Sequence, residues 1–409
     1  HILVYAFDIL MQIYTAYGYT PRDAVQKILE NNLYGLDIDE RASQLAYFAV
    51  MMKARQYDRR IFSREITPHV YSIKESNEID QSTIDYFIDN NLELKKEFTT
   101  LLQEMRDAKE YGSILNVSAL NFDLLDQRMQ EIMDDISIFR EIAVDAIAPL
   151  LRVARTMAQK YDVVVTNPPY MGSSGMSPKL SAFTKDYYPD TKSDLFACFI
   201  DKGNRMVKRN GFNCMVTMQS WMSLSSYETM RTKIVANKTI TTLMHMENMV
   251  MGIAFGTTVT VFRNSPLSDY IGTYHHVRYK DIVNDQPATF PVVGNRYVQI
   301  STDKFTKIPG SPIAYWVSDQ LLSAFDNGKT LGKYALARNG MKTGDNGRFL
   351  RLWWEVRNDK LKTDVHSYSE AASTDAKWFP YNKGGEYRKW YGNNEYVVNW
   401  ENCGNEIFN

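Results

Sequence analysis

The chain has 409 residues, 44% of them hydrophobic and 13% aromatic, so it can bury a sizeable core in two domains and is not a disordered segment. It contains no run of about 18 uncharged apolar residues, which excludes an ordinary membrane-spanning helix and predicts no membrane partner. The net charge is −1, but residues 78–150 hold 16 acidic and 6 basic side chains, which leaves +9 on the rest, a balance compatible with a surface that faces nucleic acid.

The amino-terminal segment predicts helices with one short strand between them. The spacing of apolar residues predicts helices over 1–17 and 21–30. Residues 33–38 predict a short apolar strand that runs into Asp37, and a helix over 40–52 follows directly. A strand, an acidic residue and a helix in this order form half of a nucleotide-binding α/β unit.

A long helical insertion interrupts this α/β core. A strand over 70–73 ends just before Glu75, and from there to about residue 158 the pattern is helical and acidic. We interpret residues 78–158 as an insertion. The core resumes with a strand over 163–166, which is rich in valine.

The later elements continue the alternation of helix and strand. Ser193 or Asp194 can cap a helix that Asn210-Gly211 ends. The further predicted elements are a strand over 212–218, a helix over 227–236, a strand over 240–246, and an antiparallel pair of strands over 257–263 and 271–279. Beyond about residue 310 tryptophan, glycine and basic residues become frequent, so we place a domain boundary there.

The cysteines and histidines show no metal-ligand spacing. We expect free thiols in a reducing cytoplasm, and no zinc, at the three cysteines, Cys198, Cys214 and Cys403. We expect three histidines in or beside strands rather than at a metal: His245, His275 and His276.

The most specific motif is Asn167-Pro168-Pro169-Tyr170, which follows the strand over 163–166. The Asn167 amide oxygen and the Pro168 carbonyl oxygen can each accept one N–H of adenine's exocyclic amine, which stabilises the charge that develops there during methyl transfer. Proline fixes the direction of that carbonyl, and the Tyr170 ring can stack on a base swung out of a duplex. The alternative is a structural turn with two prolines.

Three residues at strand ends are candidates for holding the nucleoside half of S-adenosylmethionine. Asp37 can hydrogen-bond both ribose hydroxyls, Ile38 can pack on the adenine ring, and Glu75 can contact the adenine amine. A helix N-cap or a loop carboxylate is the alternative for Asp37. Methyl transfer from a sulfonium depends on positioning more than on acid–base work, so no general base is required.

Five segments carry a resemblance to a known family: Tyr34-Gly35-Leu36-Asp37-Ile38-Asp39, Tyr111-Gly112-Ser113-Ile114-Leu115, Asn167-Pro168-Pro169-Tyr170-Met171-Gly172, Lys377-Trp378-Phe379-Pro380-Tyr381-Asn382-Lys383-Gly384-Gly385 and Tyr396-Val397-Val398-Asn399-Trp400-Glu401-Asn402. Over essentially its whole length the chain resembles the large adenine-specific methyltransferase of BREX phage-exclusion systems. It also resembles the methyltransferase part of fused restriction–modification enzymes.

The resemblance implies a class I S-adenosylmethionine-dependent methyltransferase (Rossmann-like) α/β fold, with a twisted, largely parallel sheet and helices on both faces. It implies that the motif residues 167–170 are catalytic, that Asp37 holds the ribose, and that Phe255 closes over the flipped base. A core aromatic residue is the alternative for Phe255.

The ends of the chain differ from what the resemblance implies. The chain begins with His1 rather than methionine, which indicates a fragment. The family's Gly-rich loop and central first strand should precede His1, so residues 1–310 would form a catalytic domain that lacks both. Residues 311–409 would begin a target-recognition domain, the rest of which would lie beyond the fragment.

Basic and aromatic residues alternate near the carboxyl end. Four basic residues there, Lys377, Lys383, Arg388 and Lys389, are predicted to contact DNA phosphates and base edges. A second candidate loop, 340–346, contains Lys342. The alternative for both loops is a tryptophan-rich packing element between domains.

Together these features predict a site-specific DNA adenine-N6 methyltransferase that uses S-adenosylmethionine and acts on double-stranded DNA. The implied setting is the cytoplasm, in restriction–modification or antiviral defence, with other phage-defence subunits as partners. Two alternatives stay open. One is an enzyme of the same motif class that methylates RNA or a protein glutamine, and the other is a non-catalytic DNA-sensing module.

Overall fold

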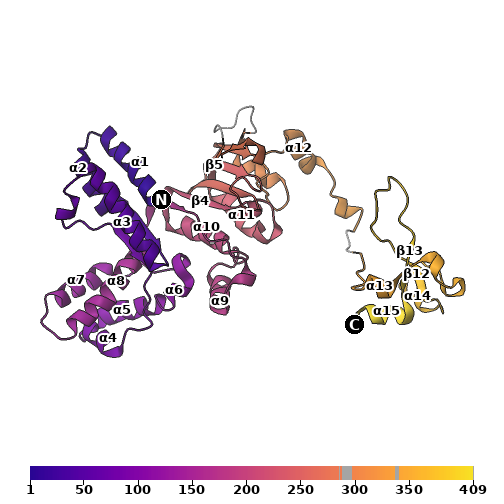
Figure 1. The fold of residues 1–409 in the computed structure, drawn as a ribbon, viewed down its shortest axis with the longest axis horizontal. Helices are drawn as coiled ribbons and strands as arrows, with labels where there is room; N and C mark the ends of the chain where they lie inside the picture. Colours follow the sequence, from indigo (N-terminus) through magenta and orange to yellow (C-terminus); the bar gives the residue numbers. More distant parts are fainter. Residues whose placement is uncertain (285, 288–296, 337–339, 409) are drawn as a thin grey trace. The chain divides into compact units, whose positions relative to one another are not determined.

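The computed structural model describes residues 1–284, 286–287, 297–336 and 340–408. The chain separates into two compact units, His1–Gly328 and Lys329–Asn409, and each is described by itself (Figure 1). Ile313 and Tyr315 are buried in the core of the first unit, so this unit extends beyond the boundary placed at 310. No helix in the described part of the chain is long and apolar enough to cross a membrane.

A two-stranded parallel sheet begins the first unit. Its strands are β1 (Tyr34–Asp37) and β2 (His69–Ser72). Three helices share a core beside it: α1 (Ile2–Ala16), α2 (Pro21–Lys27) and α3 (Glu40–Tyr57). The predicted order of strand, acidic residue and helix is confirmed.

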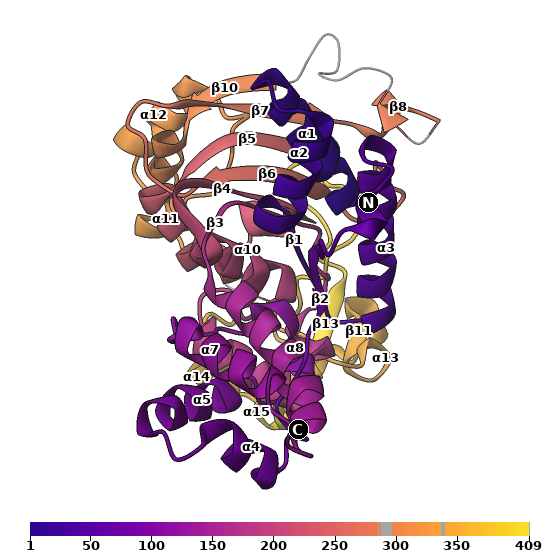
Figure 2. The ribbon, with the colours of Figure 1, turned by 90° about the vertical axis from the view of Figure 1, so that its left-hand side faces the viewer.

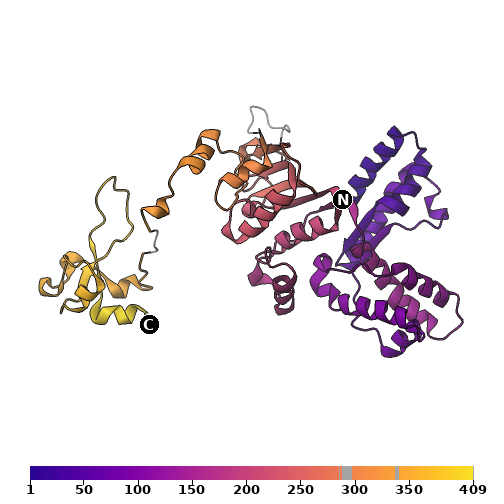
Figure 3. The ribbon, with the colours of Figure 1, turned by 180° about the vertical axis from the view of Figure 1, so that it is seen from behind.

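The acidic segment predicted to be helical is helical. Its helices are α4 (Gln81–Ile88), α5 (Leu92–Glu104), α6 (Ala108–Tyr111), α7 (Phe122–Met133) and α8 (Arg140–Ala158). Figure 3 shows them, in purple, as a group next to the indigo amino-terminal helices. Their apolar faces share one core with Ile73, which directly follows β2, so the insertion is anchored on that strand.

A six-stranded mixed sheet follows, in the order β10-β7-β5-β6-β4-β3 (Figure 2). Its strands are β3 (Tyr161–Thr166), β4 (Val207–Met218), β5 (Thr239–Met246), β6 (Thr257–Arg263), β7 (Ile271–Val277) and β10 (Tyr297–Ser301). The remaining elements of this unit are α9 (Pro178–Tyr187), α10 (Leu195–Met206), α11 (Glu228–Asn237), α12 (Asp319–Asn327) and the short pair β8 (Ile282–Val283) and β9 (Gln286–Pro287). The expected largely parallel sheet is in fact mixed, because β6 and β10 run antiparallel to their neighbours.

The prediction that β6 and β7 form an antiparallel pair is wrong. β6 lies between β4 and β5, whereas β7 pairs with β5 in parallel and with β10. Strands that are consecutive in sequence often pair directly, and this preference misled the prediction. The structure instead places β6 at the centre of the sheet.

The predicted end of the helix before β4 is also wrong. Helix α10 ends at Met206, and Asn210 and Gly211 lie within β4. A Cβ at Gly211 would lie 2.5 Å from the backbone oxygen of Asp162, and Asn210 has a φ of 68°. These two residues therefore form an irregular stretch where β4 passes close to β3, not a helix terminus.

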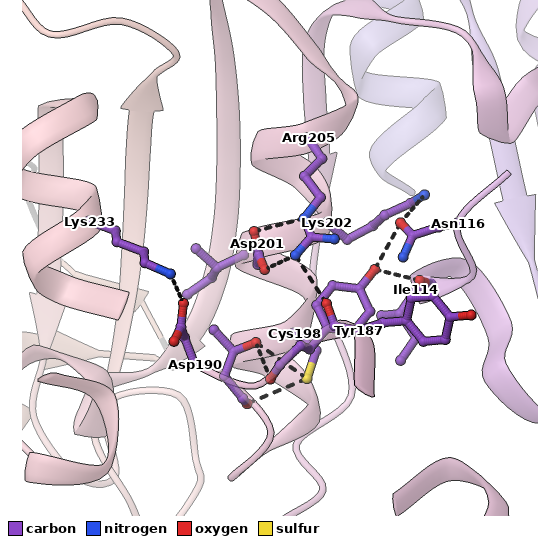
Figure 4. A network of polar contacts seen from close by, with 12 residues as sticks. Ile114, Asn116, Tyr187, Asp190, Cys198, Asp201, Lys202, Arg205 and Lys233 are labelled. Atoms are coloured by element: carbon purple, nitrogen blue, oxygen red, sulfur yellow. Dashed lines mark hydrogen bonds and ion pairs between the residues drawn. The ribbon is translucent and has the colours of Figure 1, made fainter. Parts of the chain in front are cut away.

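No strand pairing among the described residues joins the two-stranded sheet to the six-stranded sheet. Side chains make the connection instead, by holding segment 107–116 against α9 and α10. The buried Lys202 ammonium donates to the Leu115 carbonyl oxygen at 2.7 Å. Figure 4 shows the same ammonium beside Asn116, whose Oδ1 lies 3.4 Å away. The Tyr188 hydroxyl donates to the Ile114 carbonyl oxygen at 2.5 Å. Hydrogen bonds from a charged donor are stronger than neutral ones, so Lys202 holds this segment firmly.

The second unit is built on a three-stranded antiparallel sheet in the order β11-β13-β12. Its elements are α13 (Asn346–Phe349), β11 (Leu350–Leu352), α14 (Tyr368–Ala372), β12 (Trp378–Pro380), β13 (Tyr396–Asn399) and α15 (Glu401–Phe408). Leu350, Phe379 and Val398, one from each strand, form its core. All strand pairing in this sheet is antiparallel, unlike the parallel pairs β1-β2 and β3-β4 of the first unit.

The buried lysine makes stability depend on pH. Burial lowers the pKa of Lys202 from its ordinary value of 10.5 to about 8. The unfolded chain therefore binds more protons than the folded chain between these values, so the stability contributed by this residue rises with pH across that window. We expect wild-type protein to gain about 3 kcal/mol of unfolding free energy relative to Lys202→Met between about pH 7.5 and 10.5, measured by urea denaturation. An equal difference between the two proteins at both pH values would contradict this.

Candidate active site

The motif Asn167-Pro168-Pro169-Tyr170 leaves the sheet at the end of β3. Because β3 and β4 are parallel, the motif lies at their shared carboxyl edge, where open α/β sheets bind ligands. Asn167 and Pro169 are exposed, whereas Pro168 is buried and Tyr170 is half-buried. The Asn167 amide is therefore accessible, on a backbone that two prolines make rigid.

The Tyr170 hydroxyl is shared between two acceptors. It lies 3.3 Å from Asn167 Oδ1 and 3.3 Å from the carbonyl oxygen of Val216 in β4. Burial raises the pKa of Tyr170, which keeps the hydroxyl protonated and able to donate. This contact turns the oxygen of the Asn167 amide toward Tyr170 and fixes the ring against β4.

Two aromatic rings meet Tyr170 edge-on. The Phe196 ring lies 6.2 Å away at 88°, and the Phe255 ring lies 5.6 Å away at 70°. Phe196 is fully buried in the first turn of α10, whereas Phe255 is half-buried in the loop before β6. Phe196 thus supports Tyr170 from the core. The structure brings together Tyr170 and Phe255, the two residues predicted to stack on a base.

A single carboxylate oxygen ties the motif to the helix that follows. Asp194 Oδ1 accepts the backbone N–H of Met171 at 3.1 Å and that of Phe196 at 3.2 Å. Asp194 is 9% exposed, and this burial raises its pKa. The sequence predicted Asp194 as one of two possible helix caps, but it gave no signal that the same side chain also holds the residue that follows Tyr170.

The cofactor candidates lie at the ends of β1 and β2. Asp37 Oδ1 accepts the backbone N–H of Asp39 at 2.9 Å, and Asp39 in turn caps α3. The helix-cap alternative therefore applies to Asp39 and not to Asp37, which closes the turn. The Asp37 side chain is half-buried, and the neighbouring Ile38 is 52% exposed.

Glu75 and segment 107–116 lie beside these residues. Glu75 Oε2 accepts the Lys109 backbone N–H at 3.3 Å. A Cβ at Gly112 would lie 3.5 Å from Ile38 Cδ1, so the Gly112 backbone faces the exposed Ile38 side chain. The structure thus brings Asp37, Ile38 and Glu75 together at one edge. The role of segment 107–116 as their neighbour was missed, although Tyr111-Gly112-Ser113-Ile114-Leu115 is one of the five segments that carry the family resemblance. That resemblance did not indicate which residues the segment contacts.

The same segment also contacts α9 and the residue that caps it. The Tyr111 and Phe183 rings stack at 4.2 Å, and Lys179 forms an ion pair with Asp107 at 3.1 Å. The Ser177 hydroxyl donates to Glu110. Segment 107–116 is therefore the structural link between the cofactor candidates and the motif.

In the second unit, the loop between β12 and β13 carries three of the five predicted DNA contacts, Lys383, Arg388 and Lys389. Tyr387, Trp390 and Tyr391 are 86–87% exposed, and Arg388 and Lys389 are exposed beside them. The predicted residues divide into two groups. Lys342, Arg388 and Lys389 are exposed, whereas Lys377 is paired with Glu401 at 2.6 Å and Lys383 lies over the Tyr396 ring at 4.3 Å.

The sequence and its relatives agree with this geometry. A family model described as Eco57I restriction-modification methylase matches residues 31–250. The chain is 37% identical to a protein named adenine-specific methyltransferase PglX from Lacticaseibacillus casei (strain Zhang), with 100% of this chain and 35% of that protein aligned. It is 36% identical to adenine-specific methyltransferase BrxX from Escherichia coli O9:H4 (strain HS), with the same coverage. It is 25% identical to type II methyltransferase M.VspI from Vibrio sp. (strain 343) over 49% of this chain and 46% of that protein. The chain spans about a third of the length of the first two relatives.

Removing the Asp194 carboxylate tests how the motif is held. Asp194→Ala leaves two backbone N–H groups without their acceptor, so we expect a loss of about 1–3 kcal/mol of unfolding free energy. Asp194→Asn keeps an Oδ1 acceptor, and we expect it to lose less than about 1 kcal/mol. Urea denaturation of both variants measures the difference. Equal losses would show that the shared acceptor is not what holds the motif.

Proposed function

The chain belongs to the Eco57I restriction-modification methylase family, and on this basis we propose that it carries the catalytic residues of a DNA adenine-N6 methyltransferase. The observation that carries the proposal is the position of Asn167-Pro168-Pro169-Tyr170 at the end of β3, with Phe255 facing the Tyr170 ring. Because the chain spans about a third of its curated relatives, the activity belongs to the full-length protein.

The motif supplies what methylation of an aromatic amine needs. The lone pair of the adenine amine is delocalised into the ring, so the nitrogen is a poor nucleophile until its N–H bonds meet acceptors. Asn167 Oδ1 and the Pro168 carbonyl oxygen provide two acceptors, which stabilise the positive charge that develops as the methyl group arrives. A base turned out of the duplex stacks on Tyr170, and Phe255 closes over it from the facing loop.

The ends of β1 and β2 fit the nucleoside half of S-adenosylmethionine. The Asp37 carboxylate suits two ribose hydroxyls, and the exposed Ile38 side chain offers an apolar surface to the adenine ring. The Glu75 carboxylate is an acceptor for the adenine amine. When bound, S-adenosylmethionine supplies an electrophilic methyl group on sulfur, and the residues of this chain position the nitrogen that receives it.

Double-stranded DNA is the proposed substrate, and the cytoplasm is the proposed location. The exposed basic and aromatic residues of the loop between β12 and β13 can meet phosphates and base edges, which supports a nucleic acid over a protein glutamine. The match to a restriction-modification methylase family supports DNA over RNA. The 36–37% identity to proteins named PglX and BrxX agrees with the resemblance to BREX phage-exclusion systems, and from it we infer a role in phage defence beside other defence subunits. A non-catalytic DNA-sensing module remains the competing function, and the first experiment below separates the two.

Asn167→Ala in the full-length protein removes one of the two acceptors for the target amine. We expect a loss of at least about 100-fold in methyl transfer, because the developing charge then lacks a preorganised partner. Radiolabelled S-adenosylmethionine with host and phage DNA measures the rate, and digestion of the product identifies N6-methyladenine.

Two controls accompany this variant. Cofactor affinity, measured by calorimetry, should stay within about twofold of wild type, since Asn167 is not among the residues proposed to bind it. Asn167→Asp keeps an acceptor oxygen and should retain more activity than the alanine variant. Wild-type protein that binds both cofactor and DNA without labelling the DNA would instead support the sensing module.

Arg388→Ala combined with Lys389→Ala tests the DNA-facing loop. If both residues meet phosphates, the slope of log affinity against log salt should fall by about 2, with weaker binding to every sequence. A matched control, Arg357→Ala with Lys362→Ala, removes the same charge from residues that pair with Asp359 and Asp364. Fluorescence anisotropy over a salt series measures the slopes. The same change in both double variants would reject a specific role for this loop.

A further inference from the structure

Hydrogen bonds join three polar side chains, those of Gln219, His245 and Tyr315, near Phe255 and at the same edge of the sheet as the motif. His245 Nε2 lies 2.5 Å from Gln219 Oε1, and His245 Nδ1 lies 3.1 Å from the Tyr315 hydroxyl. Gln219 directly follows β4, and His245 is the penultimate residue of β5. Met218 and Met246 are both paired with Thr257, the first residue of β6, so the three strands bring these side chains to the start of β6.

The hydrogen bonds fix the protonation of His245. An amide oxygen only accepts, so the bond to Gln219 requires a proton on Nε2, and Nδ1 is then the acceptor for the Tyr315 hydroxyl. Burial, together with the stacked His276 ring 5.1 Å away, lowers the pKa of His245 to about 4. His245 is therefore a neutral imidazole with one defined tautomer near pH 7.

Gln219 in turn fixes the backbone next to Phe255. The Gln219 backbone N–H donates to the Gly256 carbonyl oxygen at 3.0 Å. A Cβ at Gly256 would lie 2.2 Å from Gln219 Oε1, so the Gly256 backbone packs directly against the Gln219 amide. The peptide that follows Phe255 thus rests on a side chain that His245 holds in one rotamer.

The other end of the Phe255 loop is anchored separately. The Glu247 backbone N–H donates to the Val277 carbonyl oxygen at 3.0 Å, and its carboxylate pairs with His276 at 3.3 Å and Arg278 at 3.7 Å. Between the two anchors the loop is largely exposed, and Met249 has a φ of 69°. Gln219 therefore contacts the backbone of the residue that directly follows Phe255, and so limits where the Phe255 ring can lie.

We propose that His245 is a positioning residue for base capture, acting through Gln219 and Gly256 to hold Phe255 opposite Tyr170. His245 touches neither the target base nor the cofactor. This inference rests on the proposed function, because Phe255 has a base to hold only if the protein turns adenine out of DNA. Without His245 the Gln219 amide can rotate, and the Phe255 ring loses its fixed distance from Tyr170.

The test uses the full-length protein with two duplexes of the same sequence. The unmodified duplex gives kcat and KM, and a second duplex, with 2-aminopurine in place of the adenine that wild-type protein methylates, reports the position of the target base. Fluorescence of 2-aminopurine rises when the base leaves the stack and falls when it stacks on an aromatic ring. His245→Ala should lower kcat by about 10- to 100-fold, because small misplacements in a site cost rates of that order. KM for DNA and the affinity for S-adenosylmethionine should change by less than about threefold, and the fluorescence of the bound duplex should differ from wild type.

Conservative variants separate positioning from general destabilisation. His245→Gln can place an amide N–H where Nε2–H lies and should recover at least part of kcat, as should free imidazole added to His245→Ala. Gln219→Ala should match His245→Ala, and the double variant should be no slower than either one, because both act through one contact. Tyr315→Phe, which keeps the Gln219 contact, should have a smaller effect than either.

Each failure has a distinct meaning. Wild-type protein that methylates no DNA would remove the proposed function and this inference with it. Methylation by wild type together with unchanged kcat and fluorescence in His245→Ala would overturn this inference alone. Additive losses in the double variant would do the same, as would a kcat loss in His245→Ala that neither His245→Gln nor imidazole recovers.

Discussion

The two sheets of the first unit share no strand pairing among the described residues, so side chains decide how the motif faces the cofactor candidates. The central contact is the buried Lys202 ammonium on the Leu115 carbonyl oxygen, supported by the Tyr188 hydroxyl on the neighbouring carbonyl. A further contact joins the sheets directly, where the Tyr34 ring of β1 meets the Tyr161 ring of β3 at 5.4 Å. Burying a charged lysine costs solvation free energy, and the hydrogen bond to the Leu115 carbonyl oxygen offsets part of that cost. The same bond fixes segment 107–116, which contacts the cofactor candidates on one side and α9 on the other.

The site itself is assembled at strand ends rather than in an enclosed cavity. Asp37 ends β1 and Asn167 follows β3, while the start of β6 brings Phe255 opposite Tyr170. The parallel strands β3 and β4 share one carboxyl edge, and the antiparallel strand β6 contributes its amino end to that edge, whereas β1 belongs to the separate two-stranded sheet. The central antiparallel strand β6 is therefore what allows a loop far along the chain to face the motif.

Much of this could be predicted from sequence, and the limits have physical causes. The motif, Asp37 and the helical insertion are local patterns, and family membership together with the mixed α/β architecture confirms the predicted class I methyltransferase fold and the resemblance to BREX methyltransferases. The partners of β6 could not be predicted, because pairing depends on contacts distant in sequence. The contacts among Gln219, His245 and Tyr315 could not be predicted for the same reason, because these residues are distant in sequence and come together only in the folded sheet.

The shared oxygen of Asp194 has a consequence for how the site moves. One oxygen atom, Asp194 Oδ1, accepts hydrogen bonds from the Met171 backbone and from the first turn of α10. A movement of the Asp194 side chain therefore breaks both hydrogen bonds at once. The end of the motif and the start of α10 therefore form a single cooperative opening unit, in which the amide hydrogens of both segments exchange with solvent together. Fraying of the helix and loosening of the motif thereby become one event instead of two.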